Sequence, residues 1–267
     1  MRELHDLVVG IAVEAAELAR IRRHEGVDVA ASKSSLVDIV TEADREVERF
    51  VVERLLAARP DDGILGEEGA SVAGTSGLTW VIDPIDGTVN YFYDIPAYAV
   101  SIALVEGEPE PTTWRALSGV VVNGATGERF EALRGGGARL DGHEIRVADA
   151  VPASMALVGT GFGYDAGRRE RQAAVVQGLI GSVRDIRRIG SAALDLASVA
   201  CGRLNGYFER GLQPWDMAAG ALLVEEAGGA LRGWEGEPAS SAFLLAAHPT
   251  LADELTALLA PLRPQDV

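Results

Sequence analysis

Two carboxylates, Asp83 and Asp86, stand three residues apart just after a stretch of strand formers, residues 80–82. Pro84 cannot extend a sheet ladder, so we expect the strand to stop at Asp83 and the chain to turn there. The turn would leave both carboxylates close together, next to the N–H groups of residues 87–88 at the start of a short helix, where an anion is favoured. Carboxylates beside an anion site indicate a hard divalent cation such as Mg²⁺ and the hydrolysis of a phosphate ester.

Ordinary turns explain part of this stretch equally well, because Asp-Pro and Asp-Gly are common turn dipeptides. Three more acidic positions therefore matter, and each has a simpler explanation of its own. Asp44 follows Thr41 at the spacing of a capping box. Glu67 belongs to an adjacent acidic pair bracketed by glycines, and such pairs are usually solvated. Asp216 follows Pro214 at a helix start, where it would complement the helix dipole.

The composition indicates a globular protein with a strong acidic bias. The chain has 267 residues, 48% of them hydrophobic, and a formal net charge of −16. This charge disfavours nucleic acid as a partner, because the phosphates of nucleic acid need a basic face. It does not disfavour a phosphorylated small molecule, since bound cations can invert the local sign of a cleft.

The chain shows no signal of export or membrane insertion. No stretch of about 18 uninterrupted apolar residues occurs, and Glu3, His5 and Asp6 stand where a signal peptide would have a basic start and an apolar run. Cys201 is the single cysteine, which excludes an internal disulfide and a zinc site built from cysteines. We therefore expect a cytoplasmic protein with no membrane partner.

The two halves of the chain follow different patterns. Residues 2–24 have the apolar spacing of an amphipathic helix, a second helix is capped at Thr41, and strands and hairpins follow. After about residue 150, strand and helix alternate, which is typical of a sheet covered by helices. We expect an α+β part over residues 1–150 that carries most of the ligands, an α/β part over residues 151–267 that completes the site, and a cleft between them.

Four segments together resemble the inositol monophosphatase family of Mg²⁺-dependent phosphatases. They occur in the family's order between residues 33 and 229 and consist of DIVTEAD (38–44), GEE (66–68), DPIDGT (83–88), and WDMAAG (215–220) leading into EAGG (226–229). One such motif would be weak evidence, but four in order make a specific pattern. The resemblance implies an α/β protein of the sugar-phosphatase type, a layered α/β/α/β/α sandwich that is generally a homodimer.

The resemblance also implies a site for two or three Mg²⁺ ions. Glu67, Asp83 and the backbone carbonyl of Ile85 would hold the first ion. Asp83, Asp86 and Asp216 would hold the second, and a third, weaker ion would share Glu67. Asp83 would then bridge two ions, with ligands from both halves of the chain closing the site.

The implied reaction is the direct attack of water on phosphorus, without a covalent phosphoenzyme. Two cations about 3.5–4 Å apart can clamp the attacking and leaving oxygens of an in-line displacement, so catalysis is mainly positioning and charge stabilisation. A water oriented by Glu67 and by Thr88, with Asp44 behind it, would be the nucleophile, and the amides of Gly87 and Thr88 would bind phosphate oxygens. Lys33, the only lysine, matches a loop lysine of the family, although a lone loop lysine is equally typical of solvated surface.

By the same resemblance, Asp86, Ser191, Ala192 and Glu209 line the side of the site that takes a small phosphorylated polyol. Glu209 would accept protons from substrate hydroxyl groups. Gln213 stands where some members carry histidine, which leaves the identity of the alcohol open. The first choice is myo-inositol 1-phosphate.

Several alternatives stay open. Relatives in the superfamily hydrolyse histidinol phosphate, fructose 1,6-bisphosphate or adenosine 3′,5′-bisphosphate. The two bisphosphates are disfavoured, because the sequence shows no basic group placed for a second phosphate. A protein-binding regulatory role with secondary catalysis is an alternative of another class, and a metal-free protein with coincidental acids is a third.

Overall fold

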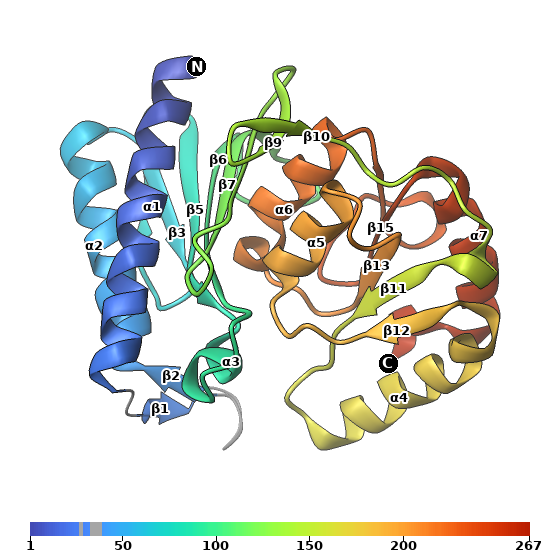
Figure 1. Cartoon of the computed structure of the whole chain (residues 1–267). Helices are drawn as coiled ribbons and strands as arrows, with labels where there is room; N and C mark the ends of the chain where they lie inside the picture. The colour runs from blue at the N-terminus through green and yellow to red at the C-terminus, as the bar shows by residue number, and fades with distance from the viewer. Residues whose placement is uncertain (27–28, 33–38) are drawn as a thin grey trace.

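The chain folds into five stacked layers, in the order helix, sheet, helix, sheet, helix (Figure 1). The computed structural model describes residues 1–26, 29–32 and 39–267. An eight-stranded sheet forms the second layer, and a five-stranded sheet forms the fourth. This arrangement confirms the layered α/β/α/β/α sandwich that the sequence predicted.

Two helices, α1 (Arg2–Glu25) and α2 (Glu42–Ala58), form the first layer. Val8, Ala12 and Ala15 of α1 are fully buried at helical spacing, so one face of this helix packs on the large sheet. A two-stranded antiparallel pair, β1 (Val29–Ser32) and β2 (Ile39–Thr41), precedes α2. Among the described residues, no helix combines the length and the apolar character that crossing a membrane requires.

The large sheet has the strand order β10-β9-β8-β7-β6-β5-β3-β4. Only β3 and β5 pair in parallel, and all its other neighbours are antiparallel. Its strands are β3 (Gly63–Gly66), β4 (Ser71–Val72), β5 (Leu78–Asp86), β6 (Ala99–Glu106), β7 (Arg115–Asn123), β8 (Arg129–Leu133), β9 (Gly137–Leu140) and β10 (His143–Ile145).

The middle layer consists of α5 (Ala192–Ala200) and α6 (Pro214–Glu226), which pack against both sheets (Figure 1). Helix α6 crosses β7 at Gly119, where an added β-carbon would lie 2.9 Å from the α-carbon of Ala219. Glycine at this position lets the helix backbone approach the sheet closely. Buried residues from both halves of the chain join here in one apolar cluster, which includes Val81, Leu196 and Leu222.

The small sheet has the order β12-β11-β13-β15-β14, and α4 (Ala166–Leu179) and α7 (Pro249–Leu259) cover its outer face (Figure 1). Its strands are β11 (Leu157–Thr160), β12 (Asp185–Arg187), β13 (Gly206–Glu209), β14 (Ala230–Arg232) and β15 (Leu244–Ala247). The strands β12, β11 and β13 are parallel, whereas β15 runs antiparallel to both of its neighbours. The predicted alternation of strand and helix is confirmed, but β14 was not predicted.

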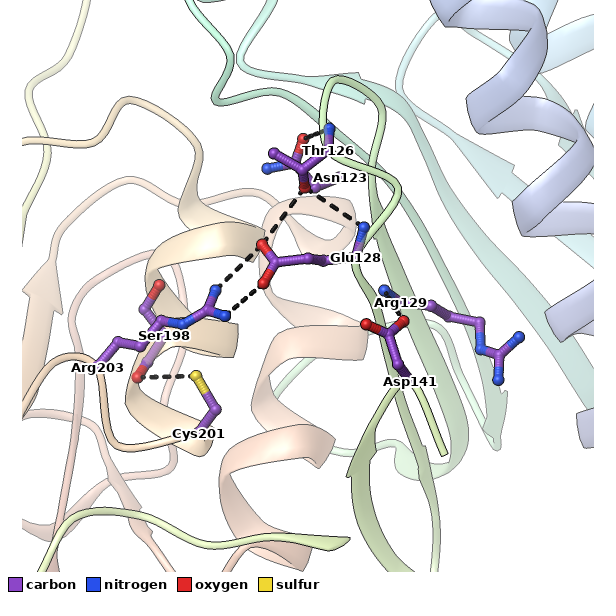
Figure 2. A network of polar contacts seen from close by, with 8 residues as sticks. All are labelled: Asn123, Thr126, Glu128, Arg129, Asp141, Ser198, Cys201 and Arg203. Atoms are coloured by element: carbon purple, nitrogen blue, oxygen red, sulfur yellow. Dashed lines mark hydrogen bonds and ion pairs between the residues drawn. The ribbon is translucent and has the colours of Figure 1, made fainter. Parts of the chain in front are cut away.

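A salt bridge between Glu128 and Arg203 joins the β7–β8 hairpin to the turn after α5 (Figure 2). Both terminal nitrogens of Arg203 donate to the Glu128 carboxylate, one of them at 3.2 Å. The Thr126 hydroxyl donates to the same carboxylate, and the N–H group of Thr126 donates to Asn123 Oδ1. The hydrogen bond from Arg203 holds the pKa of Glu128 below its ordinary value. The bridge therefore links the two halves away from the cleft.

We expect Glu128→Gln to lower the free energy of unfolding by about 1 kcal/mol or less, because the pair is bidentate but partly exposed. Since the native pKa of Glu128 is depressed, this contribution is present above the ordinary glutamate pKa and is lost as the pH falls below it. Urea denaturation at neutral pH measures the change. The control is Glu106→Gln, which removes the exposed pair with Arg115 on the same sheet and should change stability less.

Candidate active site

A β-bulge at the end of β5 places the two central carboxylates. Asp83 pairs with Ser101 of β6 and Asp86 pairs with Ala99, so three steps along β5 match two steps along β6. The prediction that the strand stops at Asp83 is therefore wrong, because β5 continues to Asp86. Pro84 lies within the bulge, where no ladder N–H group is needed.

The bulge also decides which way the carboxylates point. Side chains alternate along a strand, so residues three apart would normally face opposite sides of the sheet. The extra residue in the bulge shifts the alternation of side chains by one position, so that Asp83 and Asp86 lie on the same face of the sheet. Val81 on this face packs in the cluster with α5 and α6, whereas Trp80 and Ile82 pack beneath α1 and α2. Both carboxylates therefore face the second half of the chain.

A cavity of about 460 Å³ lies between the two halves at this point. Oxygens of Asp83, Asp86 and Asp216 lie within 4.8 Å of one another, and this is the only such acidic group within the described parts of the chain. All but two of the predicted site residues line the cavity: Glu67, Asp83, Ile85, Asp86, Gly87, Thr88, Ser191, Ala192, Glu209 and Asp216. The exceptions are Asp44, which lies behind Thr88, and Lys33, which falls outside the described residues.

Asp44 and Thr88 form the contact that the sequence predicted. The Thr88 hydroxyl donates to Asp44 Oδ1 at 3.2 Å and lies equally close to the Ile85 carbonyl. The other oxygen of Asp44 accepts from the N–H group and hydroxyl of Thr41, which completes a capping box at the start of α2. Burial raises the pKa of Asp44 to about 7. The capping role and the contact with Thr88 therefore coexist on one carboxylate.

Two residues tie the site to the helices of the middle layer. Asp86 Oδ2 accepts from the Ser191 hydroxyl at 2.7 Å and from the N–H group of Ala193 at 2.6 Å, at the start of α5. Asp216 Oδ2 accepts from the N–H group of Gln213 at 2.6 Å, at the start of α6. Each carboxylate thus caps a helix with one oxygen and retains a second oxygen for the cavity. For Asp216, the sequence predicted a position at a helix start that complements the helix dipole, but not this capping hydrogen bond.

The acids of the site repel one another unless a cation is present. Burial, then the negative charges of Glu67 and Asp86, raise the pKa of Asp83 well above its ordinary value. Burial and the same kind of repulsion raise the pKa of Asp216. Burial also raises the pKa of Asp86 to about 6, although the hydrogen bond from Ser191 opposes the shift. A set of carboxylate and carbonyl oxygens with no basic group among them suits a hard divalent ion.

The substrate side of the cavity includes residues that the sequence did not single out. Glu209 accepts a hydrogen bond from the buried Tyr207 hydroxyl, and burial raises the pKa of Glu209 to about 7. Arg168, Arg188 and Asp195 also line the cavity. No spacing rule marks these three, because Arg168 lies on α4, Arg188 between β12 and α5, and Asp195 on α5, and only the tertiary fold brings them to one cavity.

Removal of the Thr88 hydroxyl should slow catalysis without unfolding the protein. We expect Thr88→Val to lower kcat about 10²-fold, because the hydroxyl held by Asp44 is then absent from the cavity. Thr88→Ser keeps the hydroxyl and should keep most of the activity. Steady-state kinetics with a saturating metal ion measure the effect, and equal kcat values for the two variants would contradict the predicted role of Thr88.

Fold and site together define the class of this protein: a layered α/β phosphatase with an acidic cluster that could bind metal in the cleft between two sheets. A family model described as the inositol monophosphatase family matches residues 1–265, and the chain belongs to this family. The inositol-1-monophosphatase SuhB of Mycobacterium tuberculosis is 43% identical over a match that covers 96% of this chain and 93% of that protein. Members of the family depend on metal ions, and the chain is a phosphatase of this family.

Two further comparisons bear on fold and role. The crystal structure of extragenic suppressor protein suhB from Bartonella henselae has a TM-score of 0.87 and 33% identity, and the match covers 96% of this chain and 98% of that one. A protein of Xylella fastidiosa named Nus factor SuhB is 45% identical over 209 residues, or 78% of this chain and 73% of that protein. The fold is thus shared by proteins whose names point to different roles.

Proposed function

We propose that the chain hydrolyses myo-inositol 1-phosphate or a similar small phosphorylated polyol, with two or three Mg²⁺ ions as cofactors. The observation that carries the proposal is the convergence of Asp83, Asp86 and Asp216 from both halves of the chain on one cavity. The relative in M. tuberculosis named an inositol-1-monophosphatase supports the choice of substrate.

The cation ligands would be those that the resemblance implied. Glu67, Asp83 and the Ile85 carbonyl would hold one ion, Asp83, Asp86 and Asp216 a second, and Glu67 a weaker third. Bound Mg²⁺ supplies positive charge that stabilises the phosphoryl group and increases the acidity of water. These residues all line the same cavity, in keeping with this assignment.

The other residues of the chain orient the reactants. Thr88, held by Asp44, would align a water for attack on phosphorus together with Glu67. Gly87 has a positive φ of 96°, and a β-carbon there would lie 2.9 Å from the Ala97 carbonyl, so glycine is required at this position. The N–H groups of Gly87 and Thr88 would bind phosphate oxygens. Glu209, with Ser191 and Ala192, would contact the polyol hydroxyls. Lys33 stays a prediction.

Phosphate release from myo-inositol 1-phosphate, with and without Mg²⁺, tests the proposal. Turnover that needs Mg²⁺ is expected, and the absence of turnover with this ester would contradict the substrate. The panel includes histidinol phosphate, fructose 1,6-bisphosphate and adenosine 3′,5′-bisphosphate. The two bisphosphates are included because Arg168 and Arg188 line the cavity. These arginines are basic groups near the site that the sequence did not reveal.

A second candidate is a regulatory role through a protein or nucleic-acid partner, with catalysis secondary. The relative named Nus factor SuhB favours it and stands against the expectation that nucleic acid is no partner. A phenotype that survives Asp83→Asn would support this role. The dimeric state and the cytoplasmic location belong to the proposal as well. Light scattering tests the former, and cell fractionation tests the latter.

A further inference from the structure

A buried carboxylate outside the cavity, Glu48 of α2, lies directly behind the loop that carries Glu67. Glu48 is only 5% exposed. Oε2 accepts from the N–H group of Glu68 at 2.8 Å, and Oε1 accepts from the N–H group of Ala70 at 3.0 Å. Both oxygens of the carboxylate therefore bind the backbone of one short loop, residues 66–70.

Two backbone hydrogen bonds fix the rest of the loop. The N–H group of Glu67 donates to the Ile82 carbonyl at 3.1 Å, on the strand residue just before Asp83. The N–H group of Gly66 donates to the Ala70 carbonyl at 2.7 Å, which closes the loop. Glu67 is thus held between the central strand and the carboxylate of α2.

Gly66 makes room for this carboxylate. A β-carbon at Gly66 would lie 2.2 Å from Glu48 Oε2 and 2.7 Å from Glu48 Cδ. Any larger residue would displace the carboxylate from the loop or shift the loop itself. Steric crowding by Glu48 therefore explains why the residue before Glu67 is a glycine.

The position is unfavourable for an acid unless the acid has a specific task. Burial raises the pKa of Glu48, the charges of Glu68 and Glu67 raise it further, and the two N–H bonds oppose the shift. A carboxylate is the side chain that offers an acceptor to both N–H groups without adding a donor. An amide could satisfy only one of them, and an apolar side chain would satisfy neither.

We propose that Glu48 is a positioning residue for the metal site, whose carboxylate holds residues 66–70 so that the Glu67 side chain stays in the cavity with Asp83. The inference rests on the proposed function, because it takes Glu67 as a ligand. Hydrogen-bond partners that orient a ligand typically change metal affinity 10–100-fold when they are replaced. Glu48 itself touches neither substrate nor metal.

The first test is Glu48→Gln. Its amide nitrogen must face one of the two backbone N–H groups, so the loop loses at least one hydrogen bond. In the metal-free protein, exchange of the amide hydrogens of Glu68 and Ala70 should speed up at least about tenfold. The dissociation constant for Mn²⁺, measured by electron paramagnetic resonance, should rise about 10–100-fold. The half-saturating Mg²⁺ concentration for hydrolysis should rise.

Two further variants separate positioning from general stability. Gly66→Ala disturbs the same carboxylate from the loop side and should give the same pattern, which keeps the test decisive if Glu48→Gln does not fold. Asp62→Asn is the matched control. Asp62 is a fully buried carboxylate that accepts hydrogen bonds from Arg59, the Ser76 hydroxyl and the Trp80 indole, and in the described part of the chain it binds no N–H group of residues 66–70. The Asp62→Asn substitution should lower the stability of the protein and leave its affinity for Mn²⁺ unchanged.

The outcomes separate this inference from the proposed function. Unchanged amide exchange at Glu68 and Ala70 in both loop variants would overturn the positioning role, whatever the protein hydrolyses. Mn²⁺ affinity within about twofold of the unaltered protein in folded Glu48→Gln would overturn it too. By contrast, faster exchange and weaker Mn²⁺ binding in a protein that hydrolyses no polyol phosphate would support the positioning role and contradict the substrate.

Discussion

Asp83→Asn should abolish phosphate release and, at the same time, make the metal-free protein more stable. Asp83 contributes to both implied metal positions, so its loss should lower kcat at least about 10³-fold, in line with the large share of such reactions that charge stabilisation provides. The gain in stability has a separate cause. The variant removes a carboxylate whose pKa is raised well above its ordinary value by burial first and then by the charges of Glu67 and Asp86. Kinetics and thermal denaturation in EDTA measure the two effects.

Asp195→Asn is the matched control for this pair of effects. Asp195 is also buried, its Oδ1 has no hydrogen-bond partner among the described residues, and burial raises its pKa well above the ordinary value. It is not part of the acidic cluster that could bind metal. Its replacement should stabilise the metal-free protein as well but leave Mn²⁺ affinity unchanged. A loss of stability in Asp83→Asn, or full activity in that variant, would contradict the assignment.

Mg²⁺ should raise the melting temperature of the protein strongly near pH 7.5 and only weakly near pH 5. The pKa values of Asp44 and Glu209 are raised to about 7 and that of Asp86 to about 6, so the native state binds protons that the unfolded chain releases. For such groups, stability is greatest at low pH and falls as the pH rises from about 4 to about 7. A cation held by Asp86 and the neighbouring acids would offset their buried negative charge at high pH, whereas at low pH bound protons already do so.

Scanning calorimetry from pH 5 to pH 8, with EDTA or with Mg²⁺ at equal ionic strength, checks this dependence. A gain of about 2 kcal/mol would raise the melting temperature by roughly 4–8 °C in a chain of this size. Below pH 4 the trend should reverse, because carboxylates with depressed pKa values, such as Asp62 beside Arg59, become protonated and lose their partners. A melting temperature that does not change when Mg²⁺ is added at pH 7.5 would contradict the proposed metal site.

The sequence was sufficient to predict the chemistry of the site but not its geometry. The motifs around Asp83 and Asp216 predicted an acidic cluster from both halves, and the structure brings these residues together. The bulge could not be predicted, because the rule that proline ends a strand describes regular ladders and says nothing of a strand that continues past an unpaired residue. Arg168 and Arg188 were missed because tertiary docking alone brings them to the cavity.

Some residues had two valid interpretations, and the sequence could not show that both apply. Thr41 and Asp44 form the predicted capping box, and the same Asp44 also contacts Thr88. Asp216 caps α6 through Gln213 and also belongs to the acidic cluster. Each carboxylate has two oxygens, so a local structural role on one leaves the other free for chemistry. A local sequence pattern predicts only the structural role of the carboxylate, at the start of a helix.

The shared middle layer has a consequence for how the protein loses activity. The apolar cluster around α5 and α6 joins residues of both sheets, and the acids on β5 meet the acid on α6 across it. Any motion that separates the two sheets would expose this apolar cluster to water and, at the same time, move the acids apart. Heat inactivation and heat unfolding should therefore coincide, with no partly melted form that still turns over substrate.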